Sequence, residues 1–483
     1  MKKEKREFIE KHKTNPEALT GFTRRELLEA GAITLFSRLL VPSSVATLSQ
    51  ALFSSESHAQ TMMAQVPMIT FNLAGGASIH GNIVAKDKGG LLLPSYDKLG
   101  LGKAPEIENY LGLPFDKRSR LLEGLKSVLS PAAAARTKGL VLCTNTNIDT
   151  NGVVPLRPQY DISAAIESAG LRGKYFSDLQ LNTSLGSLRS FHENDPVSRL
   201  EIKSREEVLD SLSLTAVYAS AVSAADTTPR FSKTQKSRMA NLIGKIAEQQ
   251  FSKQSSDKYQ ASGGPITQAT KQLEDIVGGN VSGRDLVDPF KSSPATTVFD
   301  LGNKPTVETQ TIASICHCSL MGYASHGLIV LGNYDYHAPL SRIQSDQKDF
   351  EAGKRLGQIF QLAHVMQKPL FVFVATDGSN YSEISDTNLS GWSGDTTTSM
   401  QLLLSYHPTA TIESVKSQVG AYLPDQSVDK NTLVGDRSDY VASAVIANYL
   451  SMNDMLPQFA SIAPATITTA RLSEVIGLRK KAA

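Results

Sequence analysis

The stretch "SHGLIVLGNYDYH", residues 325–337, joins the pattern of a buried strand to side chains that can bind a metal. Its run Leu-Ile-Val-Leu has no alternating polar positions, which is typical of a strand covered on both faces of a parallel sheet. Asp335 and His337 follow this run, two positions apart. Since a strand alternates faces with a period of two, they would point the same way if the strand continued that far. The stretch therefore predicts a parallel sheet with a polar site at a strand end.

Other short apolar runs predict the rest of that sheet, and helical patterns lie between them. This alternation predicts an α/β fold with a mostly parallel central sheet and helices on both faces. The expected strands are 67–76, 138–143, 326–332, 369–376 and 400–406, and the expected helices include 117–129, 161–170, 204–222 and 349–367.

The segment from about 200 to 322 has a different character from the rest of the chain. It shows no clear strand, and residues 229–264 are basic, polar and helix-prone. The pattern predicts a helical insertion or cap within an otherwise single domain. A charge run of this kind is usually a solvated face and less often a binding surface.

The N-terminal residues 1–59 have the layout of a twin-arginine signal peptide. A charged opening precedes Arg24 and Arg25, a weakly apolar segment follows, and small residues at Ser57 and Ala59 suit cleavage after Ala59. The mature chain would then be a single domain, 60–483, in the periplasm of a bacterium or outside the cell. The alternative is an ordinary amphipathic helix followed by a Ser-rich linker. Arg38 interrupts the apolar region, which argues against a permanent membrane anchor.

The charge balance and the apolar runs exclude two classes of partner. The 49 basic and 47 acidic side chains give a formal net charge of +2, so no global field attracts nucleic acid. No stretch reaches the roughly 20 apolar residues that span a bilayer, so we expect no transmembrane span after signal removal. The oligomeric state stays open.

The three cysteines are an odd number, so at least one thiol stays unpaired within the chain. A bridge from Cys143 to Cys316 or Cys318 is one alternative in an oxidising compartment. The other is a free buried thiol, which the apolar run "GLVLC" ending at Cys143 favours.

Polar residues follow the predicted strands, at the edge of the sheet where α/β proteins bind ligands. Several strands thus deliver carboxylates, imidazoles, hydroxyls and amides to one edge, which predicts a binding site. These residues are Ser78 and His80 after the first strand, Asp149 after the second, Asp335 and His337 after the third, Asp377 after the fourth, and Asp395 in a later loop.

Each of these residues also has a purely structural explanation. Asp335 is a suitable residue for an Asx turn, and His337 for a surface histidine ahead of Pro339. Asp377 with Gly378 is a frequent turn dipeptide. Their concentration at strand ends favours a site over the separate explanations.

The motifs "MITFNLAGGASIHGN", "SHGLIVLGNYDYH", "GWSGDTTTSM" and the closing helix "DYVASAVIANYLSMND" occur in the order of a known family. The chain from about 66 to 456 resembles the secreted bacterial domain of unknown function family 1501, of the alkaline phosphatase and sulfatase superfamily. It departs from that family where Ser78 replaces an aspartate and where Thr396, after Asp395, replaces a histidine. The resemblance implies an alkaline phosphatase-like fold and one or two divalent metals held by Asp and His side chains.

The residue types suit a metal-dependent hydrolase of phosphate or sulfate esters, with a small molecule or a glycan ester as substrate. Zinc takes histidine nitrogen and carboxylate oxygen, whereas Mg, Mn or Ca takes carboxylates, amides and water. Asp335 and His337 are the first expected ligands, followed by Asp395, Asp377 and Asp149. Ser78, or a threonine in 144–146, is the expected nucleophile, and His80 the expected proton shuttle. The alternative is a non-catalytic envelope or secreted binding or structural protein that keeps the fold.

Overall fold

The chain is described by a computed structural model, and it divides into two compact units. One unit comprises Met1–Thr61 and Glu206–Asp288, and the other comprises Met62–Arg205 and Pro289–Ala483. All helices and strands described below belong to the second unit. The structure describes residues 66–97, 101–145, 162, 165–166, 169–171, 176–181, 199–202, 204–205, 207, 293–336, 342–376, 397–436, 438–462 and 467–481.

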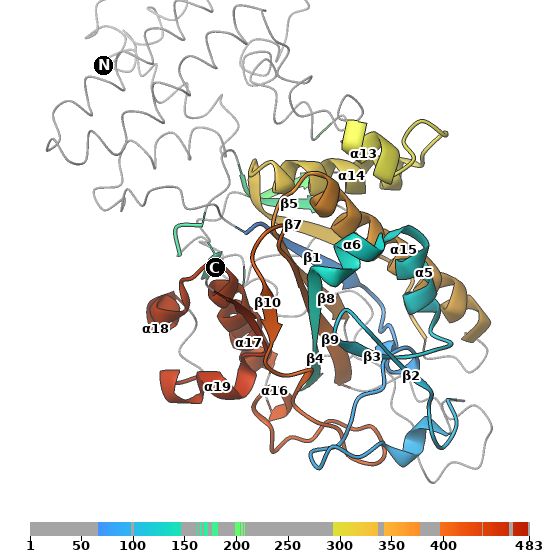
Figure 1. Cartoon of the computed structure of the whole chain (residues 1–483), viewed down its shortest axis with the longest axis vertical. Coiled ribbons are helices and arrows are strands. Elements are labelled where there is room, and N and C mark those ends of the chain that lie inside the picture. The colour runs from blue at the N-terminus through green and yellow to red at the C-terminus, as the bar shows by residue number, and fades with distance from the viewer. Residues whose placement is uncertain are drawn as a thin grey trace, which may run out of the picture. The chain divides into compact units, whose positions relative to one another are not determined.

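An eight-stranded mixed sheet forms the centre of the second unit (Figure 1). Its spatial order is β11-β4-β9-β8-β1-β7-β5-β6, and β9 alone among these strands runs opposite to the others. The fold is thus α/β with a mostly parallel sheet, as the sequence predicts. The strands are β1 (Met68–Leu73), β4 (Thr137–Asn145), β5 (Phe176–Leu181), β6 (Arg199–Ile202), β7 (Ala324–Leu331), β8 (Leu370–Thr376), β9 (Thr398–Tyr406) and β11 (Gln418–Val419).

The central strands are buried along their whole length, which explains their continuous apolar sequences. Every residue of β1, β7, β8 and β9 is buried. A strand with helices on both faces has no solvent side on which to place polar residues. Two small antiparallel pairs lie outside this sheet, β2 (Ile107–Tyr110) with β3 (Leu113–Asp116), and β10 (Ile412–Ser414) with β12 (Leu478–Lys480).

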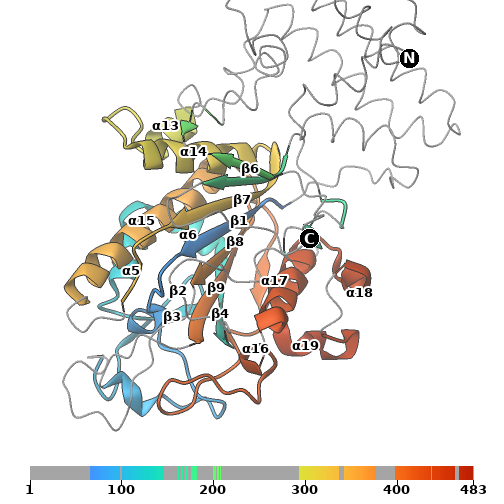
Figure 2. The same cartoon turned by 180° about the vertical axis from the view of Figure 1, so that it is seen from behind.

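Helices cover both faces of the sheet (Figure 2). The first face packs against α14 and α15, with α5 against α15, and the second packs against α17. Gly327 of β7 makes the close approach of α14 feasible, since a Cβ there would lie 2.7 Å from Ser319 Oγ. The helices are α5 (Arg120–Val128), α6 (Pro131–Ala135), α13 (Ser293–Val298), α14 (Val307–Leu320), α15 (Arg342–Val365), α16 (Leu433–Asp436), α17 (Ser438–Met452), α18 (Phe459–Ile462) and α19 (Leu472–Val475).

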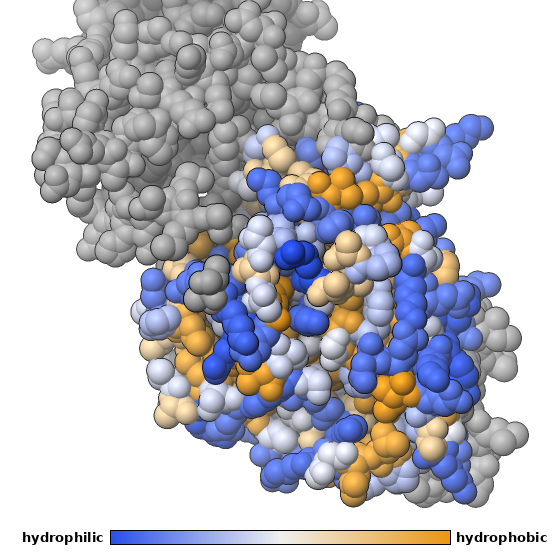
Figure 3. Space-filling view, in the orientation of Figure 1, coloured by the Kyte–Doolittle hydropathy of each residue, from blue (hydrophilic) through white to orange (hydrophobic). Residues whose placement is uncertain are grey.

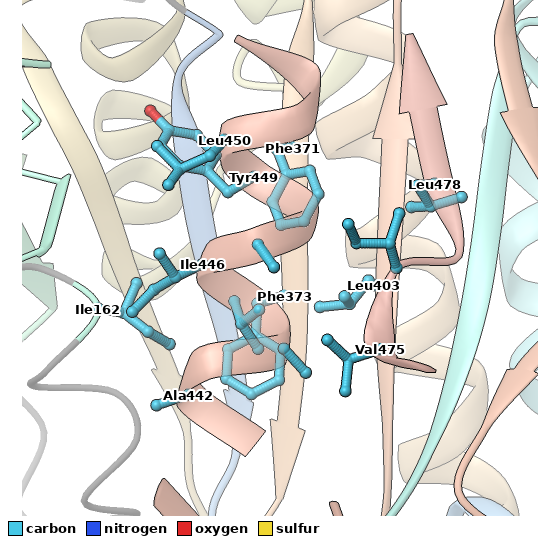
Figure 4. Packing of buried hydrophobic residues seen from close by; sticks show 14 of the residues in the cluster. Ile162, Phe371, Phe373, Leu403, Ala442, Ile446, Tyr449, Leu450, Val475 and Leu478 are labelled. Atoms are coloured by element: carbon cyan, nitrogen blue, oxygen red, sulfur yellow. The ribbon is translucent and has the colours of Figure 1, made fainter. Parts of the chain in front are cut away.

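The largest apolar cluster lies between the sheet and α17 (Figure 4). Phe371 and Phe373 of β8 and Leu403 of β9 face Ile446 and Tyr449 of the helix. The rings of Phe371 and Tyr449 meet edge to face with centroids 5.6 Å apart. Each large side chain of this kind contributes about 1.5 to 3 kcal/mol when it is fully buried. This cluster therefore anchors α17 to the strands that position the site.

The most exposed apolar side chains of the described surface lie in separate segments of the chain. Leu91, Val307 and Val365 are the most exposed of these, and they lie in different segments of the chain. Figure 3 shows hydrophobic residues in small groups between hydrophilic ones on one face of the molecule. No described helix is long and apolar enough to cross a membrane.

The predicted strands all occur, within a few residues of their expected limits. The expected helices 117–129 and 349–367 correspond to α5 and α15. The expected helix 161–170 lies partly outside the described residues, and 204–222 lies almost wholly outside them. The sheet unit also contains β6 and α14, both of which fall inside the 200–322 segment. The part of that segment outside the sheet unit is 206–288.

Candidate functional site

The carboxyl ends of β1, β4, β7 and β8 lie at one edge of the sheet, because these strands run in the same direction. In the register of β1, Leu73 pairs with Leu331 of β7 on one side and with Thr376 of β8 on the other. The antiparallel strand β9 begins at the same edge, where Thr398 pairs with Asn145 of β4. Ends of five neighbouring strands therefore lie at this carboxyl edge, where the sequence predicts the site.

Asp335 lies against the glycine pair that follows β1. The amide of Ala74 donates to Leu331 O at 2.9 Å, and the amide of Tyr334 donates to Ala74 O at 3.0 Å. Gly75 has a φ of +115°, and a Cβ there would lie 3.0 Å from the backbone nitrogen of Asp335. Only glycine adopts that φ without strain and leaves room for the neighbouring segment. The structure thus fixes the half-buried Asp335 beside the loop of the first strand.

Ser78 is buried in the turn that follows β1. The preceding amide, of Ala77, donates to Thr376 Oγ1 at 2.8 Å and ties this turn to the end of β8. Ser78 itself is 1% exposed, and its hydroxyl has no hydrogen-bond partner among the described residues. Two of the predicted site residues, Ser78 and Asp335, therefore follow neighbouring strands at the same edge.

His80 is a fully buried residue of the short 3-10 helix Ile79–Gly81. Its ring meets that of Tyr422 edge to face, with centroids 4.6 Å apart. The Tyr422 hydroxyl in turn donates to Ser399 O of β9 at 2.7 Å. The imidazole of His80 is thus packed against the ring of Tyr422 and is not exposed to solvent.

Several buried oxygen atoms near this edge are available to bind a cation or a polar ligand. Asn72 Oδ1, near the end of β1, and Gln401 Oε1, near the start of β9, are buried without a partner among the described residues, as is Ser78 Oγ. Buried polar atoms normally have a partner, and water, a cation or a ligand group can supply it. The edge thus provides oxygen atoms that can coordinate a hard cation.

The other predicted ligands, Asp149, His337, Asp377 and Asp395, lie outside the described residues. In the part of the chain that is described, no group of three or more His, Cys, Asp or Glu residues could hold a metal ion. Of the predicted ligands, the described residues thus supply one carboxylate, Asp335, and a complete metal site would need the others.

The structure adds one acidic residue that the sequence prediction missed, Asp349 of α15. It is 9% exposed and accepts hydrogen bonds from Asn82 Nδ2 at 2.7 Å and from the Tyr336 hydroxyl at 2.9 Å. A signal for it was present, because Asp349 precedes Ala352 and Leu356 at helical spacing on the buried face of α15. An acidic residue in register with an apolar stripe indicates a buried carboxyl group.

Burial raises the pKa of Asp349 to about 7. Loss of hydration disfavours the charged form, and the hydrogen bonds from Asn82 and Tyr336 oppose this by stabilising the carboxylate. The nearby Asp346 adds a smaller upward contribution to the pKa. A carboxyl group with a pKa of about 7 thus accepts a hydrogen bond from Tyr336, the residue next to Asp335.

The three cysteines are free and buried. Burial raises the pKa of each thiol far above its usual value, so none is available as a thiolate near neutral pH. Cys143 lies in β4, and Cys316 and Cys318 lie in α14. The structure therefore agrees with the free-thiol alternative.

Comparisons of the chain with protein-family models, with curated proteins and with solved structures found no match.

Proposed function

We propose that the chain is an exported metal-dependent hydrolase-like protein of the phosphatase and sulfatase type, which acts on phosphate or sulfate esters at the carboxyl edge of its sheet. The observation that carries this proposal is the register of β1, β7 and β8, which brings the turn containing Ser78 and the segment containing Asp335 to one edge. The mostly parallel sheet with helices on both faces also suits the alkaline phosphatase-like fold that the sequence resemblance implies.

In this proposal Asp335 and His337 hold a divalent ion, with Asp395, Asp377 and Asp149 as further ligands. A bound divalent ion supplies Lewis acidity to an ester oxygen. The buried oxygens of Asn72 and Gln401 would orient polar groups of the substrate, or the water molecules around the ion. The Ser78 hydroxyl is the candidate nucleophile, since it lies in the turn that is tied to the end of β8.

A second candidate function is binding without catalysis on the same fold. The observation that favours it is the burial of both predicted catalytic residues, with Ser78 at 1% and His80 at 0% exposure. A nucleophile and a proton shuttle have to reach the substrate. The replacements at Ser78 and Thr396 relative to the resembled family point in the same direction.

Metal content and ester hydrolysis, measured on the mature protein after export, test the proposal. We expect a bound divalent metal, hydrolysis of an aryl phosphate or an aryl sulfate, and loss of both in Asp335→Asn. Substitution of a residue that orients a metal ligand typically lowers metal affinity roughly tenfold or more. Loss of a ligand itself should lower the affinity by at least as much. Asp97→Asn is the matched control, since Asp97 is exposed and does not follow a strand of the sheet.

The results separate the two candidates. A wild-type protein that contains metal and hydrolyses either ester supports the hydrolase, provided that Asp97→Asn behaves like wild type and Asp335→Asn does not. A wild-type protein that has neither metal nor activity contradicts the hydrolase and favours the binding function.

A further inference from the structure

The side chain of Asp349 joins two loops of the carboxyl edge through one carboxyl group. Its Oδ2 accepts from Asn82 Nδ2, which belongs to the loop after β1, and its Oδ1 accepts from the hydroxyl of Tyr336, which belongs to the segment after β7. Asp349 and Asn82 are 267 residues apart in the sequence. The network therefore exists only in the folded protein.

The orientation of Asn82 is fixed by two other donors. Its Oδ1 accepts from Ser119 Oγ at 2.8 Å and from the amide of Leu121 at 3.1 Å, both at the start of α5. Since the amide oxygen is engaged there, the amide nitrogen has to point at Asp349. The partner of Asn82 in α15 must therefore be an acceptor.

The segment Asn333–Tyr336 is anchored on both sides of Asp335. Before it, the amide of Tyr334 donates to Ala74 O, and the Tyr334 hydroxyl donates to Lys348 O at 3.2 Å. After it, Tyr336 is 1% exposed and directly follows Asp335 in the chain. The hydrogen bond from Tyr336 to Asp349 thus ties the residue next to Asp335 to α15.

We propose that Asp349 is a positioning residue for Asp335, which holds the 333–336 segment against the loop after β1 through its hydrogen bonds to Tyr336 and Asn82. The role of Asp335 as a ligand rests on the proposed function, whereas the anchoring of the segment does not. Both loops are fixed to α15, which packs closely on α5. The rigid pair of helices thereby sets the place of a carboxylate at the edge of the sheet.

The hydrogen-bond chemistry predicts which substitutions keep this network. In Asp349→Asn the amide oxygen accepts from Asn82, and the amide nitrogen donates to the Tyr336 oxygen, so both links persist. In Asp349→Ala both links are lost. Tyr336→Phe removes only the link to the segment and keeps the buried ring.

Hydrogen exchange of the Tyr334 amide in the full chain is the test, because this amide bonds to Ala74 O only while the segment is docked. We expect exchange about tenfold faster than wild type in Asp349→Ala and in Tyr336→Phe, and within about threefold of wild type in Asp349→Asn. Tyr449→Phe is the matched control, since it also removes a buried hydroxyl, one that bonds to Val66 O before β1. The Tyr334 amide should exchange at the wild-type rate in Tyr449→Phe.

An unchanged Tyr334 exchange rate in Tyr336→Phe would overturn the proposal, and this variant decides the test if Asp349→Ala does not fold. The affinity for Mn²⁺ is the second measurement, and we expect a loss of about tenfold or more in Tyr336→Phe and none in Tyr449→Phe. Faster exchange with unchanged Mn²⁺ affinity would refute the link to Asp335. A wild-type protein that binds no Mn²⁺ would contradict the proposed metal site, while the exchange rates still decide the anchoring.

Discussion

The buried carboxyl group of Asp349 should make the stability of this protein depend on pH between 3.8 and about 7. Burial raises its pKa from 3.8 to about 7, so between these values the folded protein binds a proton that the unfolded chain has released. Stability from this group is fully present below pH 3.8 and is lost as the pH rises through 7. The slope reaches about 1.4 kcal/mol per pH unit, and the total is on the order of 4 kcal/mol.

Asp349→Asn should remove this dependence, because the amide keeps the hydrogen bonds and does not titrate. We expect the free energy of unfolding of wild type, minus that of the variant, to decrease as the pH rises from about 5 to about 8. Urea denaturation at several pH values measures it. Parallel curves for the two proteins would mean that Asp349 is ionised throughout this range.

Gly75 should resist substitution more than Gly102, another glycine with a positive φ. Gly75→Ala places a Cβ 3.0 Å from the amide nitrogen of Asp335 at a φ of +115°, so strain and crowding add. We expect a loss of about 2 to 4 kcal/mol in the free energy of unfolding, measured with urea. Gly102→Ala is the control, because its φ is +82° and no other atom lies within 4 Å of the added Cβ. Equal losses in both variants would show that the Asp335 segment is not packed on Gly75.

At the scale of elements, the sequence predicts helix α15, but only the structure shows how this helix packs. The spacing of its apolar residues predicts a helix over 349–367, and the structure has one from Arg342 to Val365. The sequence does not show that α15 packs on α5 through glycines. A Cβ on Gly353 would lie 2.1 Å from the carbonyl oxygen of Leu121, so the two backbones nearly touch. Such an approach depends on both helices and cannot be inferred from either alone.

Gly353→Ala should therefore separate the two helices. The added Cβ meets backbone, which cannot move as a flexible side chain can, and we expect a loss above about 3 kcal/mol in the free energy of unfolding. Gly302→Ala is the control, since no atom lies within 4 Å of its added Cβ. It should change stability by less than about 1 kcal/mol. Urea denaturation of both variants measures the difference, and a small loss in Gly353→Ala would contradict the close packing of α5 and α15.

At the scale of the whole molecule, the export hypothesis is the prediction that concerns the entire chain. If Arg24 and Arg25 direct the twin-arginine route, replacing both by lysine should leave an uncleaved precursor in the cytoplasm. Cell fractionation with an antibody against the mature chain measures this. The control is the double substitution Lys5→Arg with Arg6→Lys in the charged opening, which keeps the charge and leaves the arginine pair intact. Normal export of the paired mutant would remove the twin-arginine hypothesis.

The sequence by itself determined the class of fold and the places where polar residues follow strands. Continuous apolar runs predict β1, β4, β7, β8 and β9, because a strand covered on both faces has no polar side. The short strands β5 and β6 escaped prediction, since a few residues with mixed polarity carry little periodic signal. The positions of Ser78 and Asp335 at the carboxyl edge follow from the same pattern.

The tertiary structure alone decided the order of the strands, the reversed direction of β9 and the surroundings of each described candidate residue. His80 is buried against Tyr422, and Asp349 pairs with Asn82. These contacts join residues that are hundreds of positions apart, so no local pattern of hydrophobicity specifies them. The pKa of Asp349 depends on the same contacts, because hydration and hydrogen bonding are set by neighbours that only folding brings together.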